Sequence, residues 1–281
     1  MEKKLSIGRW IKSSCREWQK HFTSFFILSL VVTGSLYAGL VLMVNKVDPQ
    51  LISAAAEQSL NNWFVLALSN YSLTNGYNLF GDLLAIGYLT ATLLASYALT
   101  KFVWNAISRR QLHLYLLPDF LQESFWFLLG CSLAVALFTG VMNGCAHMIS
   151  LFTSAGFSLA GVIAFVVIML YCFILGLRSV FFPWALADGA GNTIAAVVHS
   201  FRVTHNNFWR FFAAFLIIGV MALSIMILGG LAAAKFSLIS ASTRLVWVIF
   251  INAFLNTIVT IASGCLYKQL RDNARENSEL E

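Results

Sequence analysis

The sequence predicts an all-α polytopic membrane protein. We expect a single integral membrane domain over residues 1–281, with six transmembrane helices in a bundle and amphipathic helices at the membrane interface. The chain is 59% hydrophobic and 11% charged, whereas a soluble domain is about 25% charged, and its mean hydropathy is +0.78. Its apolar runs are about 23 to 26 residues long, as a bilayer-crossing helix requires. They lack the period-two alternation of a membrane β-barrel.

Residues 1–21 are predicted to form a cytoplasmic amphipathic helix. Trp10, Ile11 and Trp18 share one helical stripe, and six basic residues surround it. This segment is too polar for a cleavable signal, and it can hold anionic headgroups at about 1 kcal/mol for each basic residue near the surface. The first span follows at residues 21–45 and is expected to remain as a signal anchor.

The connection over residues 46–81 is the longest. Residues 51–64 have an amphipathic pattern that predicts a half-buried helix on the opposite surface. The short apolar run WFVLAL inside it cannot cross about 30 Å of hydrocarbon. The second span is predicted at residues 83–104, and a basic connector, residues 105–123, leads from it to the third span.

The third and fourth spans, residues 124–149 and 155–177, are predicted to form a tight antiparallel hairpin because the connection between them is very short. Both carry small residues at four-residue spacing, which lets helix backbones approach closely. We therefore expect close helix contacts at these positions: Ala136, Gly140, Gly144, Gly156, Ala160 and Ala164.

A surface helix is predicted between the fourth and fifth spans. Pro183 stops the preceding helix, Asp188 and Gly189 supply turn and cap residues, and a new helix begins near Thr193. Its apolar face consists of Ile194, Val197, Val198 and Phe201. Its polar face consists of Asn192, His199, Arg202 and His205. This 3.6-residue pattern indicates a helix lying flat on the membrane surface.

The last two spans are predicted at residues 211–234 and 245–267. Asn206 and Asn207 end the surface helix, and an aromatic and basic anchor launches the fifth span. That anchor consists of Phe208, Trp209 and Arg210. Residues 268–281 are polar and are expected to form a cytoplasmic tail with a frayed helix.

The distribution of basic residues predicts the orientation. With six spans, 15 of the 18 basic residues fall on the side of the N-terminus. By the positive-inside rule, both termini then lie in the cytoplasm. Aromatic stretches at residues 5–21, 107–123 and 193–205 precede each pair of spans, which indicates either a parallel repeat of three hairpins or a pattern common to membrane proteins.

The run FFPWALADGAGNTIAAVVHSFRVTHNNFWRFFAAFLII resembles a segment shared by six-span bacterial membrane families. These include the YciC-type inner-membrane proteins and the membrane domain fused to some glycerophosphodiester phosphodiesterases. The positions that resemble theirs are Pro183, Asp188, Ser200, Thr204, Asn207 and Trp209. The resemblance covers about 40 residues and implies a bacterial inner membrane, but no catalytic residues accompany it.

Two groups of residues are candidates for function. The first is expected to contact lipid headgroups at the interface: Arg178, Asp188, Arg202, Trp209 and Arg210. An ion pair of Arg178 with Asp188 is the structural alternative, with a gating pair as the rival hypothesis. The second group lies within spans and would line a polar cavity or make interhelical hydrogen bonds: Asn143, Asn252 and Asn256.

Other function classes find no support in the pattern. The five cysteines are scattered without metal-ligand spacing, and common hydrolase and nucleotide-binding motifs do not occur. The basic residues lie in short segments rather than on one face, which argues against nucleic-acid binding. The span centres carry no ionisable residue, which disfavours ion-coupled transport.

We therefore predict a non-enzymatic protein without cofactor that organises lipid or serves as a membrane-assembly subunit. The alternative is a transporter of a hydrophobic or amphipathic small molecule.

Overall fold

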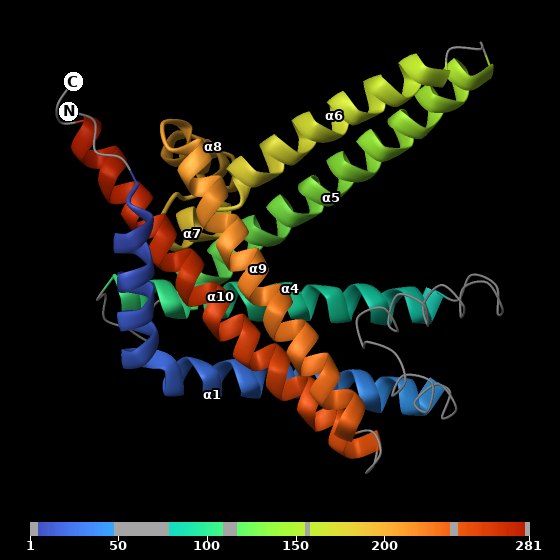
Figure 1. The fold of residues 1–281 in the computed structure, drawn as a ribbon. Helices are drawn as coiled ribbons and strands as arrows, with labels where there is room; N and C mark the ends of the chain where they lie inside the picture. Colours follow the sequence, from blue (N-terminus) through green and yellow to red (C-terminus); the bar gives the residue numbers. More distant parts are fainter. Residues whose placement is uncertain (1–4, 48–78, 109–116, 155–157, 237–240, 279–281) are drawn as a thin grey trace. The chain divides into compact units, whose positions relative to one another are not determined.

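The structure is a computed structural model that describes residues 5–47, 79–108, 117–154, 158–236 and 241–278. These residues form helices joined by turns, with no strand among them, so the all-α prediction is confirmed for this part of the chain (Figure 1). The predicted surface helix at residues 51–64, and Arg109 and Arg110 of the basic connector, lie outside the described residues. The chain divides into two compact units, and each is described by itself.

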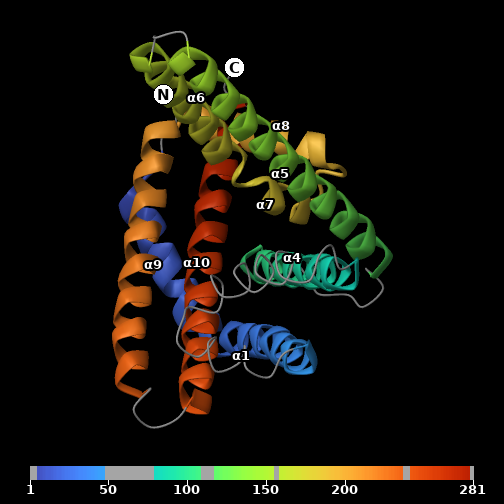
Figure 2. The same cartoon turned by 90° about the vertical axis from the view of Figure 1, so that its right-hand side faces the viewer.

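The first unit contains Trp104–Ala214 together with Met1–Ile7 and Leu266–Glu281. Its helices are α5 (Leu117–Ser154), α6 (Ser158–Ser179), α7 (Phe182–Ala187) and α8 (Thr193–His205). Pro118 and Asp119 occupy the first turn of α5, where a missing N–H and a negative charge are both favourable. Helices α5 and α6 run side by side as a hairpin in both views (Figures 1 and 2). Helix α8 packs against α5, α6 and α7.

The second unit contains Gly8–Val103 and Phe215–Cys265. These residues belong to α1 (Ile7–Val47), α4 (Leu79–Ile107), α9 (Phe208–Phe236) and α10 (Ala241–Ser278). Phenylalanine rings join three of the helices at centroid distances of 5.1 to 5.8 Å. The pairs are Phe22 with Phe254, Phe25 with Phe102, and Phe26 with Phe250. Trp247 Nε1 of α10 also donates a hydrogen bond to the Gly229 carbonyl of α9 at 3.1 Å.

Close helix contacts occur at glycines other than those predicted. A Cβ atom at Gly140 or Gly144 would meet nothing within 4 Å in the described part of the chain, so the predicted close packing there is wrong within a single chain. A Cβ at Gly130 would lie 2.8 Å from Thr193 Cγ2, and one at Gly229 would overlap Ile251. The four-residue spacing of small residues does not identify either glycine, because the close contact at each is made by one facing side chain, Thr193 or Ile251.

Four stretches within the described residues are long and apolar enough to cross a membrane. They are Pro118–Met148, Gly161–Ala187, Phe208–Ala232 and Val246–Glu276. In the most apolar 18 residues of each stretch, only 11 to 22% of the residues are buried, as hydrocarbon solvent allows. The two remaining predicted spans, at residues 21–45 and 83–104, lie in α1 and α4 and remain predictions.

Two helices run further than predicted. Helix α1 starts in the amphipathic segment and continues without a break into the first predicted span. Helix α10 continues past residue 267 to Ser278 and buries Leu270, Arg271 and Asn273. The expected fraying from residue 268 is therefore wrong for the described part of the tail, because these side chains pack inside the first unit.

Candidate functional site

The site is built around the break between α6 and α7. Pro183 has no N–H to donate to the Ser179 carbonyl, and its ring would clash with that carbonyl in a continuous helix, so the chain turns and restarts as α7. The turn leaves backbone groups without helical partners. Ser200 of α8 satisfies two of them, since its Oγ donates to the Arg178 carbonyl at 2.5 Å and accepts the Phe181 N–H at 3.2 Å. One fully buried hydroxyl thus attaches α8 to the break.

The loop between α7 and α8 uses the residues that its backbone requires. Asp188 follows the last residue of α7 as its C-cap. Gly189 and Gly191 have φ angles of +104° and +80°, in the left-handed region where a side chain would be strained. Asn192 is the N-cap of α8, and its Oδ1 accepts the Ala195 N–H at 2.8 Å. The predicted turn at Asp188 and Gly189 is therefore confirmed, whereas the residue that caps α8 is Asn192, which the sequence pattern places on the polar face of the helix.

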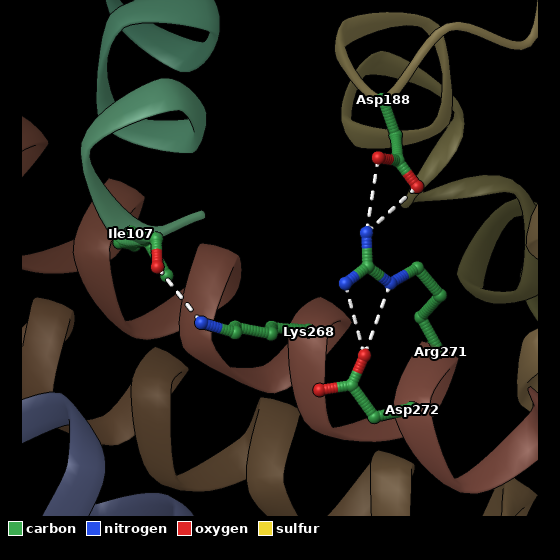
Figure 3. Close-up of polar contacts among 5 residues, drawn as sticks. All are labelled: Ile107, Asp188, Lys268, Arg271 and Asp272. Atoms are coloured by element: carbon green, nitrogen blue, oxygen red, sulfur yellow. Dashed lines mark hydrogen bonds and ion pairs between the residues drawn. The ribbon is translucent and has the colours of Figure 1, made fainter. Parts of the chain in front are cut away.

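Asp188 is paired with Arg271 near the end of α10 (Figure 3). Arg271 Nη1 lies 3.0 Å from both carboxylate oxygens of Asp188, while Nε and Nη2 donate to Asp272 Oδ1 at 3.1 and 2.9 Å. The Arg271 and Asp188 side chains are only 11% and 9% exposed. The guanidinium also lies over the Trp104 ring, 5.0 Å from its centroid, which adds a cation–π attraction.

The Trp104 ring beneath the Arg271 guanidinium belongs to a cluster of buried aromatic rings. Trp104 contacts Trp184 and Tyr267 at centroid distances of 6.2 and 5.1 Å, and Phe181 contacts Tyr267 and Phe211 at 5.6 and 5.2 Å. All five side chains are at most 5% exposed. A charge in such surroundings is stable only with a partner close by, so the carboxylate and the guanidinium depend on each other.

A second contact joins α10 to the end of α4. Lys268 Nζ donates to the carbonyl of Ile107, the last residue of α4, at 2.8 Å (Figure 3). The last carbonyls of a helix lack intrahelical donors, and a lysine there satisfies one of them and complements the helix dipole.

His199 lies on the side of α8 that faces the aromatic residues. Its ring centroid is 6.1 Å from that of Tyr267, and its Nε2 is buried without a hydrogen-bond partner in the described structure. Burial lowers the pKa of His199 below its ordinary value of 6.5. The charge of Asp188 acts in the opposite direction, and that of Arg202 acts in the same direction as burial. The imidazole is therefore neutral at pH 7.

The chain next to the N-terminus is fixed by the start of α9. Asn207 Oδ1 accepts the Leu5 N–H at 2.8 Å, and Arg210 Nη1 donates to the Leu5 carbonyl at 2.8 Å. Leu5 itself is 1% exposed. Part of the Arg210 guanidinium, predicted to meet lipid, is thus used within the protein.

Helix α8 has a buried face and an exposed face, and neither matches the apolar and polar faces that the sequence predicts. The face buried in the protein consists of small and hydroxyl residues: Thr193, Ala196, Ser200, Val203 and Thr204. Ile194 and Val198 of the predicted apolar face are 76% and 52% exposed, and Arg202 and His205 are exposed as well. Thr193 also donates to the Trp126 carbonyl of α5, which fixes the start of the helix.

The other predicted candidates are dispersed. The Arg178 guanidinium lies 5.3 Å from the centre of the Phe208 ring, and Trp209 is 76% exposed. Asn143 of α5 is exposed and belongs to the first unit, whereas Asn252 and Asn256 belong to the second. Asn252 Nδ2 donates to the Val248 carbonyl of its own helix at 3.0 Å. A polar cavity lined by the three asparagines remains a prediction.

Sequence reasoning missed Arg271 and Trp104. The sequence pattern places Arg271 in a polar tail and Trp104 at the end of a span. One signal was available, because the apolar pattern of the last span continues at helical spacing through Leu266 and Leu270, which predicts a helix that stays buried. The choice of Arg271 as the partner of Asp188 carries no local signal, because 83 residues separate the two.

Comparison of the chain with protein-family models, curated proteins and solved structures finds no match. The class of protein therefore rests on the fold and its composition. The four apolar helices of spanning length found among the described residues define a multi-pass α-helical membrane protein. The resemblance to six-span bacterial families remains an expectation from residues 181–218.

Proposed function

We propose that this chain is a six-span protein of a bacterial inner membrane, with both termini in the cytoplasm, and that it binds anionic lipid headgroups through the exposed face of α8. Its role would be to organise lipid or to act as the membrane subunit of a larger assembly, without catalysis. The observation that supports this most directly is the exposed stripe of α8. It consists of Ile194, Val198, Arg202 and His205.

The spacing of these residues is the physical argument. Positions 194, 198, 202 and 205 are three or four apart and fall on one side of the helix. Two exposed aliphatic side chains beside basic ones are unfavourable in water but suited to the boundary between headgroups and acyl chains. Trp209, at the start of α9, adds an exposed aromatic side chain of the kind enriched at that depth.

Lipid retention by the purified chain tests this proposal. In detergent, native mass spectrometry would compare phosphatidylglycerol with phosphatidylcholine of the same acyl chains. We expect tighter binding of phosphatidylglycerol and a loss of about fivefold for Arg202→Gln, because a basic residue near an anionic surface contributes about 1 kcal/mol. Arg202→Lys keeps the charge and should bind within about twofold of the unmodified chain.

Lys235→Gln is the matched control, because it removes one positive charge at a position predicted to face the other side of the membrane. It should leave phosphatidylglycerol binding unchanged. If Arg202→Gln binds as the unmodified chain does, or if Lys235→Gln weakens binding equally, the headgroup site is not on α8.

A further inference from the structure

Helix α5 carries an exposed amide side chain within a stretch that is long and apolar enough to cross the membrane. Asn143 belongs to the stretch Pro118–Met148 and lies about 10 Å from the middle of the span predicted at residues 124–149, inside about 30 Å of hydrocarbon. Its side chain makes no hydrogen bond within the described structure. An amide has two N–H donors and a carbonyl acceptor, and acyl chains offer a partner to neither.

The face of α5 that carries Asn143 points away from the rest of the hairpin. Helix α5 runs beside α6, and Cys145 of α5 is 4% exposed. Asn143 is two positions earlier, which places it about 200° around the helix, on the opposite side. Residues 132–140, along the same helix, are all exposed. Within the described part of the first unit, nothing therefore covers this side of α5.

Two glycines flank Asn143 on this face. Gly140 and Gly144 are three positions before it and one after, and a Cβ atom at either would meet nothing within 4 Å in the described chain. Glycine destabilises a helix interior relative to alanine, and the described contacts of the chain give neither glycine a compensating role. Without side chains at these positions, a second helix backbone can come close enough for its side chains to reach the amide.

We propose that two copies of this chain associate through this face of α5, with Asn143 of one copy hydrogen-bonded to Asn143 of the other. Copies inserted in the same orientation bring residue 143 to the same depth, so the two amides meet across a two-fold axis. An amide is complementary to itself, because each can donate an N–H to the carbonyl of the other. The face contains none of the residues of the α8 stripe, so this inference goes beyond the proposed lipid site.

Asn256 of α10 is the rival partner for Asn143. Its side chain is also exposed and makes no hydrogen bond within the described structure. The residues three positions before it and one after, Ala253 and Thr257, are fully buried. The helix surface beside Asn256 is thus already packed inside the second unit, whereas the corresponding positions beside Asn143 are open glycines.

Removing the amide is the first test. Counting photobleaching steps of the fluorescently labelled chain in liposomes, over a range of protein-to-lipid ratios, measures the dimer. We expect the unmodified chain to dimerise and Asn143→Leu to raise the dimer dissociation constant at least about fivefold, because two interhelical hydrogen bonds are lost. Asn256→Leu is the matched control, since it removes an exposed amide from another span, and it should leave the constant within about twofold.

Blocking the approach of the two backbones is the second test. Gly144→Leu should weaken the dimer at least about tenfold, because the added side chains hold the helices apart. Gly219→Leu of α9 is the matched control, since a Cβ there also meets nothing within 4 Å in the described chain, and it should leave the dimer unchanged. Thermal unfolding in excess detergent, where the chain is monomeric, checks that each variant keeps its fold.

The proposal is overturned if the unmodified chain stays monomeric at the highest protein-to-lipid ratio, or if Asn143→Leu dimerises as the unmodified chain does. Equal weakening by Asn256→Leu would also overturn it, because the two different amides would then meet each other. The outcome is separable from that for α8, since Arg202→Gln should leave the dimer unchanged and Asn143→Leu should leave phosphatidylglycerol retention unchanged.

Discussion

At the scale of single residues, the ion pair of Asp188 with Arg271 shows how the contact between the end of α7 and α10 depends on charge. The two side chains are only 11% and 9% exposed, and the Trp104 ring covers the guanidinium. We expect Asp188→Asn to lower the free energy of unfolding by up to about 3 kcal/mol, because Arg271 then keeps only the half-exposed Asp272 carboxylate as its counter-charge. Denaturant unfolding in detergent, followed by circular dichroism, measures this change.

Asp272 provides the control for that substitution. Its carboxylate touches the same guanidinium, but its side chain is 47% exposed, so water screens the attraction. Asp272→Asn should cost less than about 1 kcal/mol. The double variant Asp188→Asn with Arg271→Met should be more stable than Asp188→Asn alone, since no guanidinium then lacks its buried carboxylate partner. Equal effects at positions 188 and 272 would contradict the assignment.

At the scale of elements, α8 depends on how closely α5 can approach it. Gly130 of α5 is the point of contact, because a Cβ there would lie 2.8 Å from Thr193 Cγ2 and 2.9 Å from Phe182 Cε2. The Thr193 hydroxyl is bonded to the Trp126 carbonyl, so the side chain cannot simply turn away. We expect Gly130→Ala to destabilise the chain by about 1 to 3 kcal/mol, as overpacking does, in the same unfolding measurement.

Gly140, further along the same helix, is the matched position. A Cβ there meets nothing within 4 Å in the described chain, so Gly140→Ala should be neutral or should stabilise by up to about 1 kcal/mol through helix propensity. Should both alanine substitutions shift stability in the same direction and by the same amount, the close approach of α5 to α8 would not be what Gly130 provides.

At the scale of the whole molecule, the orientation of α1 decides the topology. Six spans require this helix to cross the membrane between Cys15 and Lys46. Cys15 is exposed, and a Lys46→Cys variant adds a second reactive position. We expect a membrane-impermeant maleimide to label position 46 in intact cells and position 15 only in inverted vesicles, as the positive-inside rule requires.

A Cys15→Ser variant provides the control for this labelling, because the signal in inverted vesicles should then disappear. Labelling of both positions from the same side would mean that α1 does not cross the membrane. The predicted count of six spans and the cytoplasmic placement of both termini would then fail together.

The sequence by itself determined that this is a membrane protein and that its spanning segments are helices. Apolar runs longer than a bilayer is thick have one stable conformation in hydrocarbon, because only a helix satisfies every backbone group within itself. The break at Pro183 and a new helix beginning near Thr193 were equally predictable, since they follow from a missing N–H and from the turn residues Asp188 and Gly189. These are local rules, and they act within a few residues.

Only the tertiary structure decided which side chains bond the backbone at the break between α6 and α7 and which one pairs with Asp188. Ser200 bridges a break 19 and 22 residues away, and Arg271 reaches Asp188 across 83 residues. Such partners leave no periodic trace in the sequence, because a buried polar group requires only that some complementary group be near in space. For the same reason, the face of α8 that packs against the protein is its small, hydroxyl-bearing one, since Ser200 satisfies the backbone groups at the neighbouring break and Thr193 bonds a carbonyl of α5.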